Sequence, residues 1–522
     1  MILITSASFI VSDLQAEFGR IPSSFIPLAH HRLYELQHQL VSQAFPDERI
    51  FLSLPRQYDV PKSDLRRLEE LGISIIRSDG ELSLAESVRQ SMERMPLGRD
   101  PVRVLHGDSL FLSVPTEVDV INVSVPSSQQ DWFMEDEFSS DNLVWSGYFA
   151  FSHSTDFLEA LANESDFESC VLLYDKKHPM VRKENHGWQD FGHMATYYLA
   201  RQGALVTRTN NALKHKNGFL EKTGQSFKIK AEHNWYMEVP FELEKFIPKV
   251  ISGSGGVERG HSYLVEYLPL CALNEILVFG NQRIHFWSNI FVLFSEFLNT
   301  CGTQARSGSD QSTMQNPMSE LHAHVSKRLE LLEHAQGPLP LDLGIRINGK
   351  MAPSIRQIAS HCLAIVGESD AVPAVIHGDL CLGNVLFEGR LNQIRVIDPR
   401  GLDFEGNETI YGDQRYDLAK LAQSFIGQYD WILANRFDLE LDLMDDGPVV
   451  EFHVESSDLS LKVADKFLSV FLEDKVYRDE VLALMILLFI TMGPFHSESP
   501  GRQLAFLVNS ASLFNRFFGH ST

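Results

Sequence analysis

Three polar side chains in the second half of the chain have the types and the spacing that phosphoryl transfer to a hydroxyl group requires. Asp379 and Asn384 stand five residues apart in the segment HGDLCLGN, and Asp398 follows a short apolar run typical of a β-strand. Such a transfer needs one carboxylate to accept the proton of the attacking hydroxyl, and an amide and a second carboxylate to hold Mg²⁺ on the phosphates. The three residues supply these groups in that order, so we predict a phosphoryl-transfer site here.

The triplet His-Gly-Asp is a weak signal by itself, because it occurs a second time at residues 106–108 with no asparagine five residues after the aspartate. Around His377-Gly378-Asp379, by contrast, the gaps between the polar residues are filled by apolar ones (Val375, Ile376, Leu380, Val385 and Leu386). We place His377 in the catalytic set with Asp379. Its expected role is to position the loop, since Asp379 already supplies the base.

The segments HGDLCLGNVLF and VIDPRG resemble the aminoglycoside phosphotransferase and choline kinase branch of the protein-kinase-like fold. That branch carries glycine where protein kinases carry arginine, and it lacks Phe-Gly after the second aspartate; this chain shares both features. The resemblance implies an α+β bilobal fold, ATP and Mg²⁺ as cofactors, Asp379 as base, and Asn384 and Asp398 as metal ligands. It also implies that Asp417, in the next helix-like segment, accepts backbone hydrogen bonds from the catalytic loop.

A kinase-like site also needs a strand lysine that grips the ATP phosphates and a helix glutamate that holds this lysine. We predict Lys222, which follows an apolar stretch, and Glu232, ten residues later, for these roles. Lys228 and Lys230 alternate with apolar residues and stay open as alternatives for the strand lysine.

Two further segments complete the expected nucleotide site. No glycine-rich loop precedes the lysines, so residues 208–216 are expected to cover the phosphates with polar side chains. Ser262–Leu270 predicts a strand that leads into a hinge, where the backbone of Glu266 and Leu268 would meet the adenine edge.

Length and composition limit the classes of protein that fit. A chain of 522 residues is too long for one hydrophobic core, so two or three domains are expected. The formal net charge of −24 argues against nucleic acid or an anionic membrane surface as a partner. The five scattered cysteines form no metal-ligand pair and indicate reduced thiols in a cytoplasmic protein.

Neither apolar segment of note predicts a membrane anchor. The N-terminal residues MILITSASFIV predict a first β-strand rather than a signal peptide, because no basic residues precede the apolar run. The apolar run Val481–Met492 is too short to span a bilayer and predicts a buried helix.

The first half of the chain alternates strand-like and helix-like segments. Strands are expected at Ile2–Ile4, Ile50–Leu54, Ser74–Ile76 and Val102–Leu105, and helices at Leu33–Gln43, Ser63–Leu71 and Leu84–Met95. This order favours an α/β domain with a Rossmann-like mixed, largely parallel sheet over residues 1–200. Residues 201–268 are expected to form a small lobe of short strands around one helix. Residues 269–522 are expected to form a helical large lobe, with a polar loop at Gly302–Glu320.

The amino-terminal domain resembles the sugar-phosphate nucleotidyltransferases, which have a glycosyltransferase-A-like fold. Gly19–Gln37, VLHGDSLF and Val144–Ser152 resemble segments of that family, and His186–Tyr198 resembles the segment that delivers its second metal ligand. The resemblance implies that Asp108 and Asp190 hold Mg²⁺ while a phosphate oxygen attacks the α-phosphate of CTP or UTP and pyrophosphate leaves.

The same domain departs from the family at its phosphate grip. Thr5–Phe9 stands where the family has a glycine-rich loop, and Ser23 stands where it has a lysine. Either other groups take over, with Gly19, Arg20, Ser6 and Ser8 as candidates, or the domain has lost catalysis and only binds or scaffolds.

Together these features predict a bifunctional enzyme. ATP-dependent phosphorylation of a sugar, polyol or amino alcohol would be coupled to nucleotidyl transfer, which gives an activated precursor for a surface polysaccharide. A kinase with a non-catalytic first domain and an antibiotic phosphotransferase stay open as alternatives. The expected partners are nucleotides and a small-molecule acceptor, without nucleic acid or membrane insertion, and the oligomeric state stays open.

Overall fold

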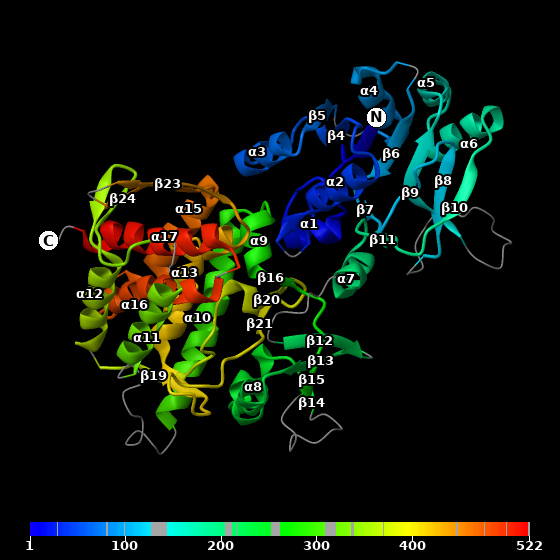
Figure 1. Ribbon diagram of the computed structural model, residues 1–522. Helices are drawn as coiled ribbons and strands as arrows, with labels where there is room; N and C mark the ends of the chain where they lie inside the picture. The colour runs from blue at the N-terminus through cyan, green and yellow to red at the C-terminus, as the bar shows by residue number, and fades with distance from the viewer. Residues whose placement is uncertain are drawn as a thin grey trace. The chain divides into compact units, whose positions relative to one another are not determined.

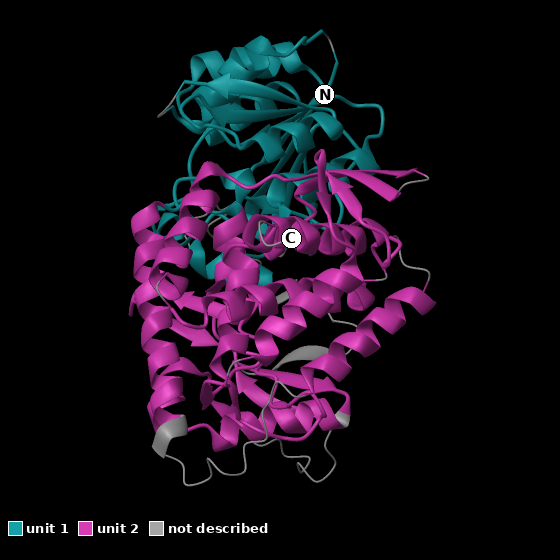
Figure 2. Cartoon of the chain, turned by 90° about the vertical axis from the view of Figure 1, so that its left-hand side faces the viewer, with its two compact units in different colours: residues 1–205, 279–282 teal, residues 206–278, 283–522 magenta. Residues whose placement is uncertain are grey.

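The computed structural model describes all residues except 29, 80–81, 99, 127–142, 204–210, 217, 252–261, 308–319, 336–338, 369, 445–446, 474, 497 and 520–522. The chain divides into two compact units (Figure 2). Unit 1 consists of Met1–Leu205 and Phe279–Gln282, and unit 2 consists of Val206–Val278 and Arg283–Thr522. That the two domains are divided near residue 200 and fold independently stays a prediction.

Unit 1 is built around a seven-stranded mixed sheet with the strand order β10-β8-β9-β6-β1-β4-β5 (Figure 1). β1 runs parallel to β4 and β6, β4 runs parallel to β5, and β9 is antiparallel to β6 and β8. The strands are β1 (Ile2–Thr5), β4 (Ile50–Pro55), β5 (Ile73–Ser78), β6 (Val102–His106), β8 (Val120–Ser124), β9 (Val144–Phe151) and β10 (Val181–Glu184). The mixed α/β sheet expected from the sequence is therefore confirmed.

Helices alternate with these strands because apolar residues recur every three to four positions in the segments between them. They are α1 (Ser12–Phe18), α2 (Leu33–Ala44), α3 (Lys62–Glu70), α4 (Leu84–Arg94), α5 (Ser154–Asn163), α6 (Phe167–Lys177) and α7 (Met194–Gly203). A short 3₁₀ helix, η1 (Ser23–Phe25), and two small ribbons, β2 (Pro27–Leu28) with β3 (His31–Arg32) and β7 (Ser109–Leu110) with β11 (Gln189–Asp190), complete the unit. One core cluster joins β1, β6, β8 and β9 to α4, α5 and α6.

The four residues Phe279–Gln282 are an integral part of unit 1. The Asn281 amide donates to the Phe18 carbonyl at 2.6 Å. The buried Arg32 guanidinium donates to the Phe279 carbonyl at 2.6 Å and pairs with Asp64 at 2.9 Å. Unit 1 thus depends on a segment far along the chain, which the sequence did not indicate.

Unit 2 begins with a four-stranded antiparallel sheet in the order β12-β13-β15-β14. Its strands are β12 (Asn211–Lys216), β13 (Phe219–Gly224), β14 (Val250–Ile251) and β15 (Ser262–Glu266). Helix α8 (Ser226–Glu238) contacts β13, β14 and β15, and the 3₁₀ helix η2 (Phe241–Phe246) follows it. This is the small sheet with one helix that the sequence predicted.

The rest of unit 2 is mainly helical. The helices are α9 (Leu273–Phe279), α10 (Ile284–Ser307), α11 (Leu321–His334), α12 (Ile355–Gly367), α13 (Gln414–Phe425), α14 (Tyr429–Leu433), α15 (Asp458–Phe467), α16 (Arg478–Met492) and α17 (Pro500–Phe518), with the single turns η4 (Leu382–Asn384), η5 (Leu468–Leu472) and η6 (Gly493–His496). Short strands hold the loops: β16 (Cys271–Ala272) with β20 (Val385–Glu388) and β21 (Gln393–Val396), and β19 (Pro373–Val375) with β22 (Tyr411–Asp413).

The apolar helix α16 forms the centre of this helical part. It packs against α11, α12, α13 and α17, and its residues Val481 to Ile490 are buried throughout. Among the described residues, the helical stretch Arg478–His496 is long and apolar enough to cross a membrane, but 72% of its apolar window is buried inside the protein. A helix that is apolar on all sides is typical of such a protein core.

Three expectations about unit 2 are wrong. The region after residue 284 also contains a four-stranded sheet in the order β18-β17-β24-β23, whose strands are β17 (Ile345–Ile347), β18 (Lys350–Ala352), β23 (Phe437–Met444) and β24 (Gly447–Val454). Lys228 and Lys230 lie on α8, so neither is a strand lysine. The predicted loop Gly302–Glu320 begins as helix, since α10 continues to Ser307; residues 308–319 of it lie outside the described residues.

Candidate functional site

The catalytic-loop residues are placed by two short antiparallel strands of unit 2. β19 ends at Val375, the loop then passes through Asp379 and η4, and Asn384 is the last residue of η4 directly before β20. β20 pairs with β21, and Asp398 follows β21 with a left-handed φ of 61°. This conformation is uncommon for a residue with a Cβ, and aspartate tolerates it better than most. The β20–β21 hairpin brings Asp398 back toward the loop.

Asp379 and Asn384 are hydrogen-bonded to each other. The Asn384 Nδ2 amide donates to the Asp379 carbonyl at 2.9 Å and to Asp379 Oδ2 at 3.2 Å. Because the NH₂ group faces Asp379, the carbonyl oxygen Oδ1 of Asn384 is the atom that could bind a cation. Amide and carboxylate oxygens are the ligands that Mg²⁺ prefers, so Asn384 and Asp398 together fit this ion.

Lys222 of β13 links the small sheet to Asp398. Its ammonium Nζ lies 2.9 Å from Asp398 Oδ1 and also pairs with Glu232 of α8. Tyr263 of β15 donates its hydroxyl to the same Glu232 oxygen at 2.6 Å. Burial and the charge of Asp398 raise the pKa of Glu232 to about 7. The lysine, the helix glutamate and the second aspartate thus form one connected set, of which the sequence analysis predicted the Lys222–Glu232 pair but not the contact with Asp398.

His377 is fixed by the backbone on both sides of its ring. Nε2 lies 2.9 Å from the Ile397 carbonyl, and the Asp379 amide donates to Nδ1 at 3.3 Å. Burial lowers the pKa of His377 to about 4, so the ring is neutral, with the proton on Nε2. This arrangement orients the loop and leaves neither ring nitrogen available as a base.

Asp417 of α13 holds the same loop from the other side. Its carboxylate accepts the His377 amide at 2.7 Å and the Gly378 amide at 2.9 Å. Burial raises the pKa of Asp417 to about 7. The backbone bonds expected for this residue are therefore present.

Lys420, one turn after Asp417 on α13, is a residue that the sequence analysis missed. Its ammonium lies 3.0 Å from Asp379 Oδ1, and its side chain is 10% exposed. Burial would raise the pKa of Asp379, but the charge and hydrogen bond of Lys420, with smaller contributions from His377 and Arg400, together outweigh this, and the pKa lies below its ordinary value. The spacing of Asp417 and Lys420 on one helix was the available signal, because residues three apart share a helix face.

The expected hinge is only partly free to bind an adenine. The Glu266 amide donates to the Lys249 carbonyl at 2.8 Å, so it is used within the sheet. The Leu268 carbonyl accepts the Leu270 amide at 2.8 Å. The Leu268 amide and the Glu266 carbonyl are the atoms that could still meet a base edge. Residues 208–210 of the expected phosphate cover lie outside the described residues, and residues 211–216 form β12.

In unit 1, Asp108 and Asp190 are neighbours. β7, directly after Asp108, pairs with β11, which places Asp190 opposite Ser109. A Cβ added to Gly192 would lie 2.9 Å from Asp108 Oδ2 and 3.2 Å from Asp190 Oδ1, so both carboxylates face this glycine. Burial and the Asp108 charge raise the pKa of Asp190 to about 6. Two carboxylates that face each other in this way fit a shared divalent cation.

The loop after β1 contacts this region through hydroxyl groups rather than a glycine-rich turn. Ser6 Oγ lies 3.3 Å from Ser23 Oγ and accepts the Ser24 amide at 2.9 Å. A Cβ on Gly107 would meet the Thr5 carbonyl at 2.4 Å and Ser23 Oγ at 2.9 Å. Ser6 and Ser23 thus lie beside the residue before Asp108, whereas the exposed Arg20 covers the ring of Phe9 at 4.0 Å.

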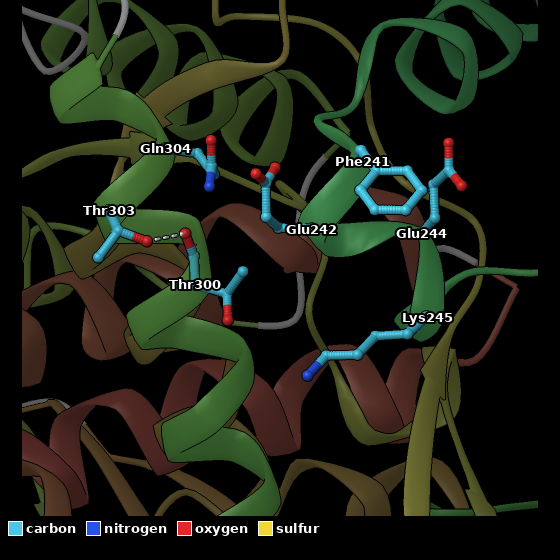
Figure 3. A pocket seen from close by; sticks show the side chains of 7 residues that line it. All are labelled: Phe241, Glu242, Glu244, Lys245, Thr300, Thr303 and Gln304. Atoms are coloured by element: carbon cyan, nitrogen blue, oxygen red, sulfur yellow. Dashed lines mark hydrogen bonds between the residues drawn. The ribbon is translucent and has the colours of Figure 1, made fainter.

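One cavity among the described residues of unit 2 contains none of these groups. It has a volume of about 740 Å³ and lies between η2 and α10 (Figure 3). Its lining consists of Phe241, Glu242, Glu244, Lys245, Thr300, Thr303 and Gln304. The cavity is therefore not the predicted site.

No model of a protein family and no curated protein matches this chain. Among solved structures, a nucleoside-diphosphate-sugar pyrophosphorylase from Vibrio cholerae RC9 is 15% identical over 38% of this chain and 98% of its own, with a TM-score of 0.33. A choline/ethanolamine kinase family protein from Mesorhizobium loti is 9% identical over 62% of this chain and 95% of its own, with a TM-score of 0.35. The aminoglycoside phosphotransferase APH(4)-Ia is 11% identical over 62% and 99%, with a TM-score of 0.35. Solved structures of both kinds that the sequence resembles are thus among its structural neighbours.

Proposed function

We propose that unit 2 transfers the γ-phosphoryl group of ATP to a hydroxyl group of a small molecule. The observation that carries this proposal is the connection of Lys222 to both Glu232 and Asp398, beside a loop in which Asp379 and Asn384 are bonded to each other. Phosphoryl transfer depends mainly on positioning and charge stabilisation, and this set supplies both.

Asp379 is the proposed base. Lys420 keeps its pKa low, so the carboxylate is ionised at neutral pH and its oxygen accepts the proton of the acceptor hydroxyl as that oxygen attacks phosphorus. The side chain is 45% exposed, so an acceptor can reach it. Lys420 acts as a positioning residue, since it holds the carboxylate in one orientation.

Asn384 and Asp398 would hold Mg²⁺, which would neutralise charge on the phosphates when bound. Lys222 would donate to phosphate oxygens, and Glu232 keeps its ammonium in place. The Leu268 amide and Glu266 carbonyl would orient the adenine. His377 and Asp417 fix the loop backbone, and neither takes part in the transfer.

Unit 1 has a second proposed activity, nucleotidyl transfer from CTP or UTP. The observation that favours it is the pair of facing carboxylates, Asp108 and Asp190, at Gly192. Coupled to the kinase, this step would activate the phosphorylated acceptor for surface-polysaccharide synthesis in the cytoplasm. The alternative is a kinase with a non-catalytic first domain, because Ser23 replaces the lysine expected for the phosphates.

The test is a screen of sugars, polyols, hydroxy acids and amino alcohols with the full-length chain. ADP is measured with ATP alone, and pyrophosphate is measured with ATP plus each NTP. ADP that depends on an acceptor and is lost in Asp379→Asn, but not in the exposed control Asp370→Asn, supports the kinase. Pyrophosphate lost in Asp108→Asn, but not in the exposed control Asp47→Asn, supports the second activity. ADP without pyrophosphate under every condition leaves the kinase-only alternative.

A further inference from the structure

A group of cationic and aromatic side chains lies next to the catalytic loop of unit 2. His324 and Arg328 come from α11, Arg400 and Phe404 follow Asp398, and Tyr416 comes from α13. The Phe404 ring lies 5.3 Å from the His324 ring and 5.5 Å from the Tyr416 ring, centre to centre. The Arg400 guanidinium lies 4.9 Å from the centre of Phe404. We call Arg328 and Arg400, together with the His324 ring beside them, the cationic cluster; its charge comes from the two arginines.

Arg400 ties this cluster to the proposed base. Its amide donates to the His377 carbonyl at 2.8 Å. A Cβ on Gly378, whose φ is 76°, would lie 2.8 Å from Arg400 Cβ, so the glycine leaves room for this arginine beside Asp379. The charge of Arg400 also contributes to the low pKa of Asp379. The cluster therefore lies where an acceptor hydroxyl must approach.

No carboxylate among the described residues forms an ion pair with a member of the cluster. Arg400 Nη2 donates to the backbone carbonyl of Asp403 at 3.1 Å, and the Arg328 guanidinium lies 4.1 Å from the ring centre of Phe495. Burial and the charge of Arg400 lower the pKa of Arg328. Burial, Arg328 and Arg400 lower the pKa of His324 to about 4. The two guanidinium groups thus repel each other in a half-buried place, where the Asp379 carboxylate interacts with Arg400 without forming an ion pair.

The nearby carboxylate groups lie close to one another or accept hydrogen bonds from backbone amides. Glu320, Asp403 and Glu405 have oxygens within 4.8 Å of one another. Asp403 Oδ1 accepts the amides of Glu405, Gly406 and Asn407 at 2.8–2.9 Å. They do not neutralise the arginines, and the cluster stays a site of positive charge in a chain whose net charge is −24.

We propose that the acceptor phosphorylated by unit 2 carries an anionic oxygen group, a carboxylate or a phosphate, which Arg328 and Arg400 bind while its hydroxyl faces Asp379. The planar guanidinium matches either group with two parallel hydrogen bonds. An anion between the two arginines would remove their repulsion, whereas a cationic aminoglycoside or amino alcohol would add to it. This inference rests on the proposed phosphoryl transfer, and it selects hydroxy acids and sugar phosphates over the other acceptor classes.

Binding is measured first, because it needs no turnover. The full chain is saturated with Mg²⁺ and a non-hydrolysable ATP analogue, and sulfate, D-glycerate, glycerol phosphate, glycerol and ethanolamine are titrated by calorimetry at constant ionic strength. We expect the anionic compounds to bind and glycerol and ethanolamine not to bind. Arg328→Gln and Arg400→Gln should each weaken anion binding at least tenfold, and Arg328→Lys should recover part of it. The matched control is Arg356→Gln, an arginine of α12 that pairs with Asp342 and Glu333 at the surface.

Turnover separates this inference from the proposed function. In the acceptor screen, Arg328→Gln should raise the KM for the acceptor about tenfold or more and leave the KM for ATP within about twofold. Equal anion binding by the wild type and both glutamine variants, with unchanged melting temperatures, would overturn the inference. So would acceptor-dependent ADP from neutral or cationic compounds alone, a result that leaves the kinase proposal standing. Anion binding that depends on both arginines, without ADP from any compound, would instead retain the anion site and count against the kinase.

Discussion

The ion pair between Lys420 and Asp379 makes a quantitative prediction about Lys420→Met. At the observed separation of 3.0 Å, two unit charges interact by about 1.4 kcal/mol at the dielectric constant of water. The value for water is the lower limit for this pair, because the Asp379 side chain is 45% exposed and the Lys420 side chain is 10% exposed. About 1.4 kcal/mol corresponds to about one pKa unit. Loss of the ammonium should therefore raise the pKa of Asp379 by at least about one unit.

The sign of the effect on turnover follows from the role of the carboxylate. A base must be deprotonated, so kcat falls as the pH falls through its pKa. In the wild type the pKa of Asp379 lies below its ordinary value, so protonation of Asp379 should not lower kcat between pH 5 and 8. In Lys420→Met, burial raises the pKa without the opposing charge, and kcat should decline toward pH 5.

The assay is acceptor-dependent ADP formation from pH 5 to 8 at saturating Mg²⁺ and ATP. Lys420→Arg keeps the positive charge and should keep the pH profile of the wild type. Lys462→Met removes an exposed lysine of α15 in the same unit and should change nothing. A pH profile and a kcat of Lys420→Met that equal those of the wild type would refute both the electrostatic reasoning and the positioning role of Lys420.

Three other predictions concern the two proposed sites and the division of the chain. Asp379→Asn should lower kcat by about 10² to 10⁴-fold and leave the affinity for ATP within about twofold, because it removes the proton acceptor and no metal ligand. Asp398→Ala should weaken Mg·ATP binding as well as lower kcat. Equal affinity for ATP in the two variants would contradict these roles. Gly192→Ala should lower pyrophosphate release by unit 1 and leave ADP formation unchanged, because the added Cβ would lie 2.9 Å from Asp108 Oδ2. Unchanged pyrophosphate release would mean that the two carboxylates beside Gly192 do not take part in nucleotidyl transfer. Fragment 205–522 should keep kinase activity. Fragment 1–205 should unfold at lower urea than unit 1 in the full chain, because it lacks the Phe279 carbonyl that accepts a hydrogen bond from the buried Arg32, and a charged hydrogen bond contributes about 1.5–3 kcal/mol. Equal urea midpoints would show that this bond contributes nothing.

The sequence alone determined the elements that local pattern encodes. The four strands and three helices expected in the first half of the chain lie within a few residues of β1, β4, β5, β6, α2, α3 and α4, because each pattern suits one geometry. The group at the catalytic loop was also predicted, since Asp379 and Asn384 are close in sequence and a hairpin returns Asp398 to them. The pairing of Lys222 with Glu232 followed from one strand and the helix after it.

The tertiary structure decided what depends on residues far apart in the chain. No local pattern reveals that the Phe279 carbonyl accepts a hydrogen bond from Arg32, that Lys420 pairs with Asp379, or that α11 places Arg328 near Arg400. The β23–β24 hairpin was missed for a related reason. Acidic and apolar residues alternate along β23, a largely exposed strand, and the pairing of β24 with β17 is set by packing. The charge of a buried group also depends on the tertiary structure. His377 is neutral because of the groups that enclose its ring, and the residues next to it in the sequence do not specify those groups.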